Sequence, residues 1–183
     1  GEGRNWSVSP MDGFAYTGRL ELYPFGRFHS NGELMEGDIY YETTPKLVIG
    51  GAYSFNHHAI REQGQKGSML PDGEYRNIGS YFVDMVFKYK GFGLVADYMG
   101  RLTHDAPHIP NPDYYIYTGS GLNVQASYLF NRKWEVALRN STMFPDDSTI
   151  PFVGYSIWNQ TTLGVTRYII GHSLKVQLDV SYN

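Results

Sequence analysis

Polar and apolar residues alternate along most of the chain, with the two-residue period of β-strands. Leu122 and Val124, for example, share one parity, and Asn123 lies on the other. This period predicts eight strands, each of roughly 9 to 13 residues, the length that a tilted strand needs to cross a bilayer. They cover residues 14–23, 47–57, 78–90, 92–104, 119–130, 133–142, 157–169 and 172–182.

The connections between the predicted strands alternate in length. "KGFG", "NRK" and "IG" are tight turns that contain Gly or Asn, whereas residues 57–77, 105–118 and 144–156 are long, polar and rich in Pro and Gly. Short turns at one end and long loops at the other are typical of outer-membrane barrels. Residues 24–46 are the exception, a long connection at the short-turn end. We expect a partly ordered insert there, or a further short strand at residues 38–42.

Sorting the strands by parity separates an apolar face from a charged one. Aromatic residues near the strand ends predict an interfacial girdle: Tyr16, Tyr23, Phe55, Tyr81, Tyr89, Phe92, Phe130, Trp134, Trp158 and Tyr168. The opposite parity carries the side chains that we predict to line a lumen: Arg19, Glu21, Asp84, Lys88, Asp97, Arg101, Gln125, Glu135, Arg139, Lys175, Gln177 and Asp179. Arg167 falls on the apolar parity, which does not fit this division unless its long side chain reaches the lipid headgroups.

An apolar sheet face needs either a second protein layer or a lipid bilayer to cover it, and parity alone does not separate these architectures. The long strands, the aromatic strand ends and the unequal loops favour an antiparallel transmembrane β-barrel. A barrel also leaves no backbone group unpaired in the hydrocarbon. Two alternatives remain: a small closed eight-stranded barrel that binds partners through its long loops, and a soluble β-sandwich that binds a ligand through its aromatic face.

The hairpin after Lys88 allows two registers. A two-residue turn would place Asp84 opposite Asp97, whereas a four-residue turn at residues 91–94 would pair Asp84 with Arg101. Like charges that face each other across two strands are destabilising. We therefore predict the four-residue turn.

The last hairpin predicts a simpler register. A two-residue turn at residues 170–171 would place Thr162 opposite Asp179 on the charged face. The same turn keeps the apolar residues of both strands together on the other face.

Composition narrows the functional classes. The chain has 183 residues, 16% aromatic residues, a mean hydropathy of -0.38 and a formal net charge of -3. These values favour one β-rich domain and give no bulk attraction to nucleic acid. The absence of cysteine excludes disulfides, cysteine-ligated zinc and a thiol nucleophile. No stretch approaches the roughly 18 consecutive apolar residues of a spanning helix.

No motif predicts catalysis, a cofactor or a metal. The sequence has no GxSxG, no HExxH and no Walker loop, so we do not expect an enzyme. Three segments contain closely spaced metal-ligating side chains: His104, Asp105 and His108; His57 and His58; Asp146 and Asp147. The first and third have the composition of plain turns, and adjacent histidines in a strand point in opposite directions.

Several segments resemble the phosphate-selective porin O/P family of Gram-negative outer membranes. They are "YTGRLELYPFG", "EGDIYYETTPKLVIGGAYSFN", "VFKYKGFGLVADYMGR", "GSGLNVQASYLF", "KWEVALRNS" and "LGVTRYIIGHSLKVQLDVSY", in the family's order from about Gly13 to the end. The resemblance implies a sixteen-stranded, usually trimeric barrel that passes small anions such as phosphate. This chain carries about half of those strands, and it stops at Asn183, where the family would run on to a further strand that ends in an aromatic residue.

From this resemblance we expect residues 1–183 to form a single outer-membrane β-barrel domain, a C-terminal portion that is incomplete at both ends. The implied partners are the lipid bilayer, lipopolysaccharide, small solutes or anions, and further copies of the chain in a homotrimer or a larger outer-membrane complex. We expect no cofactor. The predicted lumen carries five basic and five acidic side chains. Such a balance suits a general porin for small hydrophilic solutes.

Overall fold

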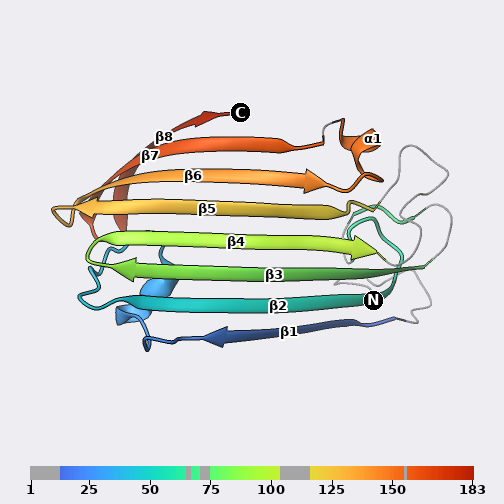
Figure 1. Cartoon of the computed structure of the whole chain (residues 1–183), viewed down its shortest axis with the longest axis horizontal. Coiled ribbons are helices and arrows are strands. Elements are labelled where there is room, and N and C mark those ends of the chain that lie inside the picture. The colour runs from blue at the N-terminus through green and yellow to red at the C-terminus, as the bar shows by residue number, and fades with distance from the viewer. Residues whose placement is uncertain (1–12, 65–66, 71–74, 104–115, 155) are drawn as a thin grey trace.

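The computed structural model shows an all-β chain whose strands form one antiparallel sheet (Figure 1). The structure describes residues 13–64, 67–70, 75–103, 116–154 and 156–183. All eight predicted strands are present, and neighbours in the sequence are neighbours in the sheet. Their bounds are β1 (Ala15–Leu22), β2 (Lys46–Ala59), β3 (Arg76–Tyr89), β4 (Phe92–Thr103), β5 (Gly119–Phe130), β6 (Trp134–Pro145), β7 (Trp158–Ile170) and β8 (Leu174–Tyr182).

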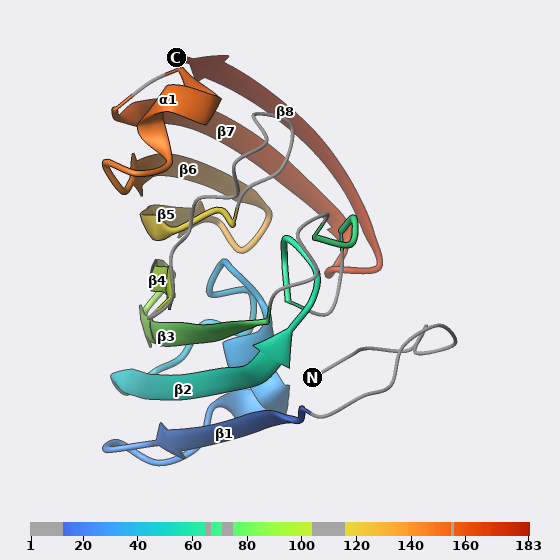
Figure 2. The ribbon, with the colours of Figure 1, turned by 90° about the vertical axis from the view of Figure 1, so that its right-hand side faces the viewer.

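The sheet is bent into an arc with one concave and one convex face (Figure 2). Within the described part of the chain, β1 pairs only with β2 and β8 only with β7, so both edges of the sheet are unpaired. All eight strands belong to this one sheet, which means that the sandwich hypothesis is wrong for the described residues. No helix among them is long and apolar enough to span a membrane.

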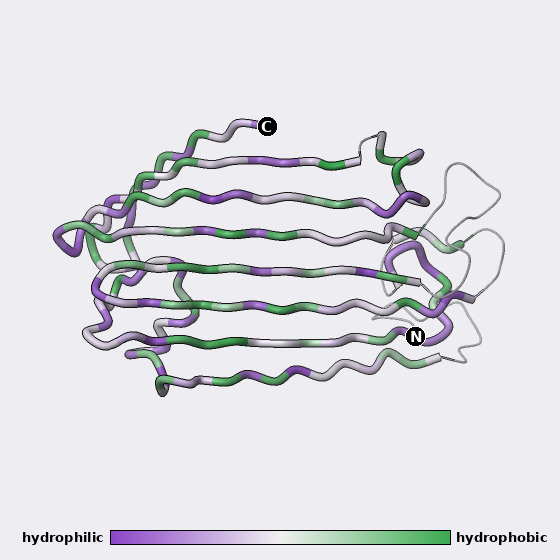
Figure 3. Tube along the Cα trace, in the orientation of Figure 1, coloured by the Kyte–Doolittle hydropathy of each residue, from purple (hydrophilic) through white to green (hydrophobic). Residues whose placement is uncertain are grey.

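Hydropathy alternates along the strands, as Figure 3 shows. Leu20, Val83, Leu138 and Leu178 point to the convex face, and each is at least half exposed. The concave face carries the opposite parity, and its polar side chains include several that are almost fully buried, such as Gln125. The sheet therefore has its apolar side chains outside and its buried polar groups inside.

The predicted four-residue turn after Lys88 is wrong. Asp84 lies opposite Asp97, and the strands are joined by the two residues Lys90 and Gly91. Both have positive φ, 49° and 87°, as in the type I′ turn whose twist matches that of the flanking strands. The repulsion that we expected is offset, because the Asp84 carboxylate accepts two hydrogen bonds from Arg19, at 2.6 and 2.9 Å.

The last hairpin also differs from the prediction. Ile170 pairs with Leu174 across a three-residue turn, and the register shifts between Tyr168 and Ile170. Thr162 consequently lies opposite Ser181, with their hydroxyl oxygens 2.8 Å apart. The shift is two residues from the predicted register, so every side chain keeps its face.

Two aromatic residues predicted for the girdle lie on the concave face instead. Tyr168 and Trp158 share their parity with Thr162, and Tyr168 is only 7% exposed. Their positions near strand ends suggested the girdle, but parity decides the face. Arg167 is exposed on the convex face, with its guanidinium carbon 5.4 Å from the centre of the Trp134 ring.

His57 and His58 do not point in opposite directions, which corrects another prediction. Their rings are stacked, with centroids 3.7 Å apart. The reason is that β2 is irregular at this point: its register shifts between Asn56 and Ala59, and His58 has a φ of 54°. The local bulge removes the alternation on which the prediction depended.

The connection between β1 and β2 folds into the concave side of the sheet. We call residues 24–46, up to and including the first residue of β2, the insert. It contains a short 3-10 helix, η1 (His29–Leu34), and a turn at residues 39–40. The predicted alternative, a short strand at residues 38–42, is not formed. The other helix among the described residues is α1 (Ile150–Val153), a single turn before β7.

Candidate functional site

One lysine of the sheet holds the insert against the concave face. The Lys88 ammonium donates three hydrogen bonds of 2.6 Å, to the carbonyl oxygens of Gly32, Met35 and Gly37. Lys88 is only 1% exposed, so its three donors are fully used within the protein. An ammonium taken out of water is costly unless it is hydrogen-bonded in this way. Burial of the Lys88 ammonium therefore requires the carbonyl groups of the insert, and these carbonyl groups are in turn held in place by Lys88.

A buried carboxylate fixes the other side of the insert. Asp38 is 1% exposed and accepts hydrogen bonds from the backbone N–H groups of Glu42 (3.0 Å) and Gly91 (2.8 Å). The backbone N–H of Lys90 donates to the Glu42 carbonyl at 2.8 Å. The insert is thus tied to the two-residue β3–β4 turn by hydrogen bonds to Lys90 and Gly91.

Glycines allow the insert to approach the sheet closely. A Cβ on Gly37 would overlap the carboxylate of Glu135, and a Cβ on Gly93 would lie 3.1 Å from the Glu36 carbonyl oxygen. These contacts come from β6 and β4, so the insert crosses the inner side of several strands. A larger residue at Gly37 would force either the Glu135 side chain or the insert to move.

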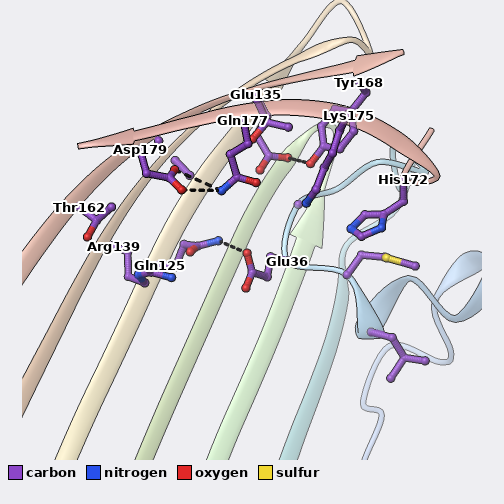
Figure 4. A pocket seen from close by; sticks show the side chains of 16 residues that line it. Glu36, Gln125, Glu135, Arg139, Thr162, Tyr168, His172, Lys175, Gln177 and Asp179 are labelled. Carbon is purple, nitrogen blue, oxygen red and sulfur yellow. Dashed lines mark hydrogen bonds between the residues drawn. The ribbon is translucent and has the colours of Figure 1, made fainter. Parts of the chain in front are cut away.

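A polar cavity of about 280 Å³ lies between the insert and strands β5 to β8 (Figure 4). Its charged and hydrogen-bonding lining is Glu36, Gln125, Glu135, Arg139, Thr162, Thr166, Tyr168, His172, Lys175, Gln177 and Asp179. Gln125 donates to Glu36 at 3.3 Å, which joins the insert to β5. The Tyr168 hydroxyl donates to Glu135 at 3.2 Å.

The cavity brings together charges of both signs. Glu36, Glu135 and Asp179 have neutral hydrogen-bond donors, namely Gln125, Tyr168 and Gln177. Arg139 and Lys175 also line it, and neither takes part in the salt bridges found among the described residues. A cavity that carries charges of both signs can hold water and small polar solutes.

A second polar cluster lies on the concave face of β1 to β5. Arg19 contacts Asp84 and also donates to Glu21 at 2.9 Å. Asp97 accepts a hydrogen bond of 3.1 Å from Asn123. The Arg19 charge is therefore neutralised locally by the two carboxylates.

All the side chains predicted to line a lumen lie on this one face, but the structure divides them into groups. Those in the cavity are Gln125, Glu135, Arg139, Lys175, Gln177 and Asp179. Lys88 holds the insert, and the polar cluster contains Arg19, Glu21, Asp84 and Asp97. Arg101 stands apart, near the long-loop end of β4. The sequence reasoning missed Glu36 and the inward-facing Tyr168, although the even parity of Tyr168 was a readable signal.

The candidate metal ligands do not form a site in the described residues, where no group of three or more His, Asp or Glu side chains could hold an ion. Asp146 and Asp147 are exposed in a turn, and the Asp146 carbonyl accepts a hydrogen bond from Thr149 N–H at 2.7 Å. His104, Asp105 and His108 lie outside the described residues.

Comparisons of this chain with protein-family models, curated proteins and solved structures found no match.

Proposed function

We propose that this chain forms part of the wall of an outer-membrane porin, a water-filled β-barrel through which small hydrophilic solutes diffuse. The observation that carries the proposal is the contrast between the two faces of the sheet. The convex face exposes large apolar side chains on every strand, whereas the concave face holds buried and hydrogen-bonded charges. Exposure of the apolar convex face to water would be unfavourable, and so would exposure of the charged concave face to hydrocarbon.

The two edges of the sheet support a barrel with more than eight strands. Every residue of β8 is exposed, and seven of the eight residues of β1 are exposed. Unpaired backbone groups at such edges are costly in hydrocarbon and need strands beside them. We propose that further strands complete the wall, as in the sixteen-stranded barrel that the family resemblance implies. A barrel closed by β1 and β8 alone finds no support in the register.

In this proposal, the insert narrows the water-filled lumen of the barrel. It lies inside the arc, where Lys88 and Asp38 fix it, and the polar cavity remains beside it. The Lys88 ammonium is fully hydrogen-bonded to carbonyl groups and Arg19 is paired with carboxylates, so neither of these cations is free to attract an anion. The charges that remain in the polar cavity are of both signs. We propose passage of small hydrophilic solutes in general, without a strong preference for phosphate. Trimers and contact with lipopolysaccharide remain proposals from the family resemblance.

Depth-dependent quenching of tryptophan fluorescence tests the membrane placement. The chain has three tryptophans, of which Trp134 is on the convex face and Trp158 on the concave face. In the double variant Trp6→Phe and Trp158→Phe, Trp134 is the only remaining tryptophan and can be excited selectively above the absorption of tyrosine. We expect brominated lipids to quench this variant strongly in reconstituted vesicles.

The matched control is the variant Trp6→Phe and Trp134→Phe, which keeps only Trp158. Its fluorescence should resist brominated lipids and respond to a water-soluble quencher such as acrylamide. Equal quenching of both variants by lipid, or of neither, would contradict the placement of the convex face in the bilayer.

A further inference from the structure

An apolar strip interrupts the polar concave face near the long-loop end. Phe82, Met99 and Met143 point inward, and these residues are 40%, 46% and 42% exposed. The register places them in one row across β3 to β6, with Gly121 between the two methionines. The neighbouring row contains Asp84 and Asp97, so the strip is not part of a larger core.

The glycine in this row creates a groove. A cavity of about 360 Å³ lies here, and its lining includes Phe82, Met99, Gly121 and Met143. A Cβ on Gly121 would meet only ordinary contacts, at 3.6 Å from the Thr142 carbonyl oxygen and 3.9 Å from Met99. The backbone therefore does not require glycine at this position. The missing side chain instead leaves space between the two flexible thioethers, which adapt well to flat apolar groups.

The positively charged side chain of Arg101 lies at the edge of the groove. Arg101 is two residues from Met99 on the same face of β4, and it lines the same cavity. Arg101 is partly buried, and its guanidinium has no hydrogen-bond or ion-pair partner in the part of the chain that the structure describes. This differs from Arg19 and Lys88, whose donors are satisfied by the protein. A planar guanidinium with free donors favours a carboxylate, which it can bind through two parallel hydrogen bonds.

The rim of the groove is held in place by hydrogen bonds. Thr118 donates its backbone N–H to the Thr149 hydroxyl at 3.2 Å, and their hydroxyl oxygens are 3.1 Å apart. Both threonines line the cavity and are nearly buried. The groove is thus preformed, and a ligand would not have to order its walls.

We propose that this groove binds small aromatic carboxylates. The ring lies on Phe82 and over Gly121 between the methionines, and the carboxylate faces Arg101. A neutral polar solute would leave the apolar strip wet, and a purely apolar one would leave the guanidinium unpaired. The proposal needs only that the concave face is open to water, so it stands apart from the porin proposal.

Fluorine NMR of 4-fluorobenzoate provides the test, with the full chain in lipid nanodiscs rather than in detergent, which could itself fill the groove. We expect the probe signal to broaden in a saturable way with the unaltered protein. Gly121→Leu should abolish this binding, because the added side chain fills the groove. Gly51→Leu is the matched control and should bind normally, since Gly51 is on the convex face with nothing within 4 Å of an added Cβ.

Arg101→Gln separates the charge from the apolar surface. We expect it to weaken 4-fluorobenzoate roughly tenfold or more and to leave 4-fluorobenzyl alcohol unchanged, because only the anion uses the guanidinium. Circular dichroism checks that each variant is folded. If Gly121→Leu does not fold, Gly121→Ala takes its place and should weaken 4-fluorobenzoate binding to a smaller degree. No saturable binding to the unaltered protein, or equal binding by folded Gly121 variants, would overturn the proposal. Equal weakening of both probes by Arg101→Gln would also overturn it.

Discussion

The Nζ atom of Lys88 lies 2.6 Å from the carbonyl oxygen of Gly37, although the two residues are 51 positions apart in the sequence. This contact joins the third strand of the sheet to the insert that precedes the second. Two further carbonyls of the insert share the same ammonium group. A single side chain of the sheet therefore binds three backbone carbonyls of the insert.

Replacing this lysine should release the insert. Lys88→Met keeps the length of the side chain but removes all three donors, which leaves three carbonyl oxygens without their partner. We expect the free energy of unfolding to fall by about 2–4 kcal/mol. Denaturant unfolding measures this change, and limited proteolysis within residues 24–46 should become faster. Lys46→Met is the control: its ammonium makes one hydrogen bond of 3.1 Å, to the Phe25 carbonyl, and its loss should cost under about 1 kcal/mol. Equal effects of the two substitutions would contradict this role of Lys88.

The close approach of the insert to β6 gives a second prediction. Gly37→Ala places a methyl group where the Glu135 carboxylate lies, so Glu135 must move away from Tyr168 or the insert must shift. We expect destabilisation of about 1–3 kcal/mol. Gly18→Ala, on the convex face with nothing within 4 Å, should change stability by less than about 1 kcal/mol in either direction. A stable Gly37→Ala protein would mean that the insert does not press against Glu135.

The register of the β3–β4 hairpin can be tested by cross-linking, because the chain has no cysteine of its own. Val83 lies opposite Tyr98. The double variant Val83→Cys and Tyr98→Cys should therefore form an intramolecular disulfide on mild oxidation. The four-residue turn would instead place Val83 opposite Leu102, so Val83→Cys with Leu102→Cys is the matched alternative. Strand positions four residues apart differ by about 13 Å, which is too far for both pairs to react. Peptide mapping by mass spectrometry identifies the disulfide, and cross-linking of only the second pair would contradict the observed register.

The strands were predictable because each one carries its own alternation. All eight were found within a few residues of the observed ends, and β5 matches its predicted bounds. The insert was harder, because the partners of Lys88 are backbone carbonyls, which leave no pattern in the sequence. The same limit explains the wrong register of the β3–β4 hairpin. The sequence shows the repulsion between Asp84 and Asp97, but not that Arg19 offsets it, because Arg19 lies on β1, two strands away from β3 in the sheet.

The candidate site was predicted in part for a related reason. Parity identified which charged side chains share the concave face, yet it could not say which of them meet. Glu36 belongs to the insert, where no period exists, and its contact with Gln125 joins residues 89 positions apart. The apolar strip is not evident from the sequence, because its members are isolated apolar positions on different strands and only the register brings them into one row.

Single-channel conductance tests the central claim most directly. The full-length protein is reconstituted in a planar bilayer, and the reversal potential is read in a salt gradient. We predict stable open steps with a reversal potential close to zero, because the free charges of the cavity are mixed. A reversal potential that strongly favours anions would contradict the proposed lack of phosphate preference but not the channel. A protein that is inserted and folded yet never opens would contradict the porin itself.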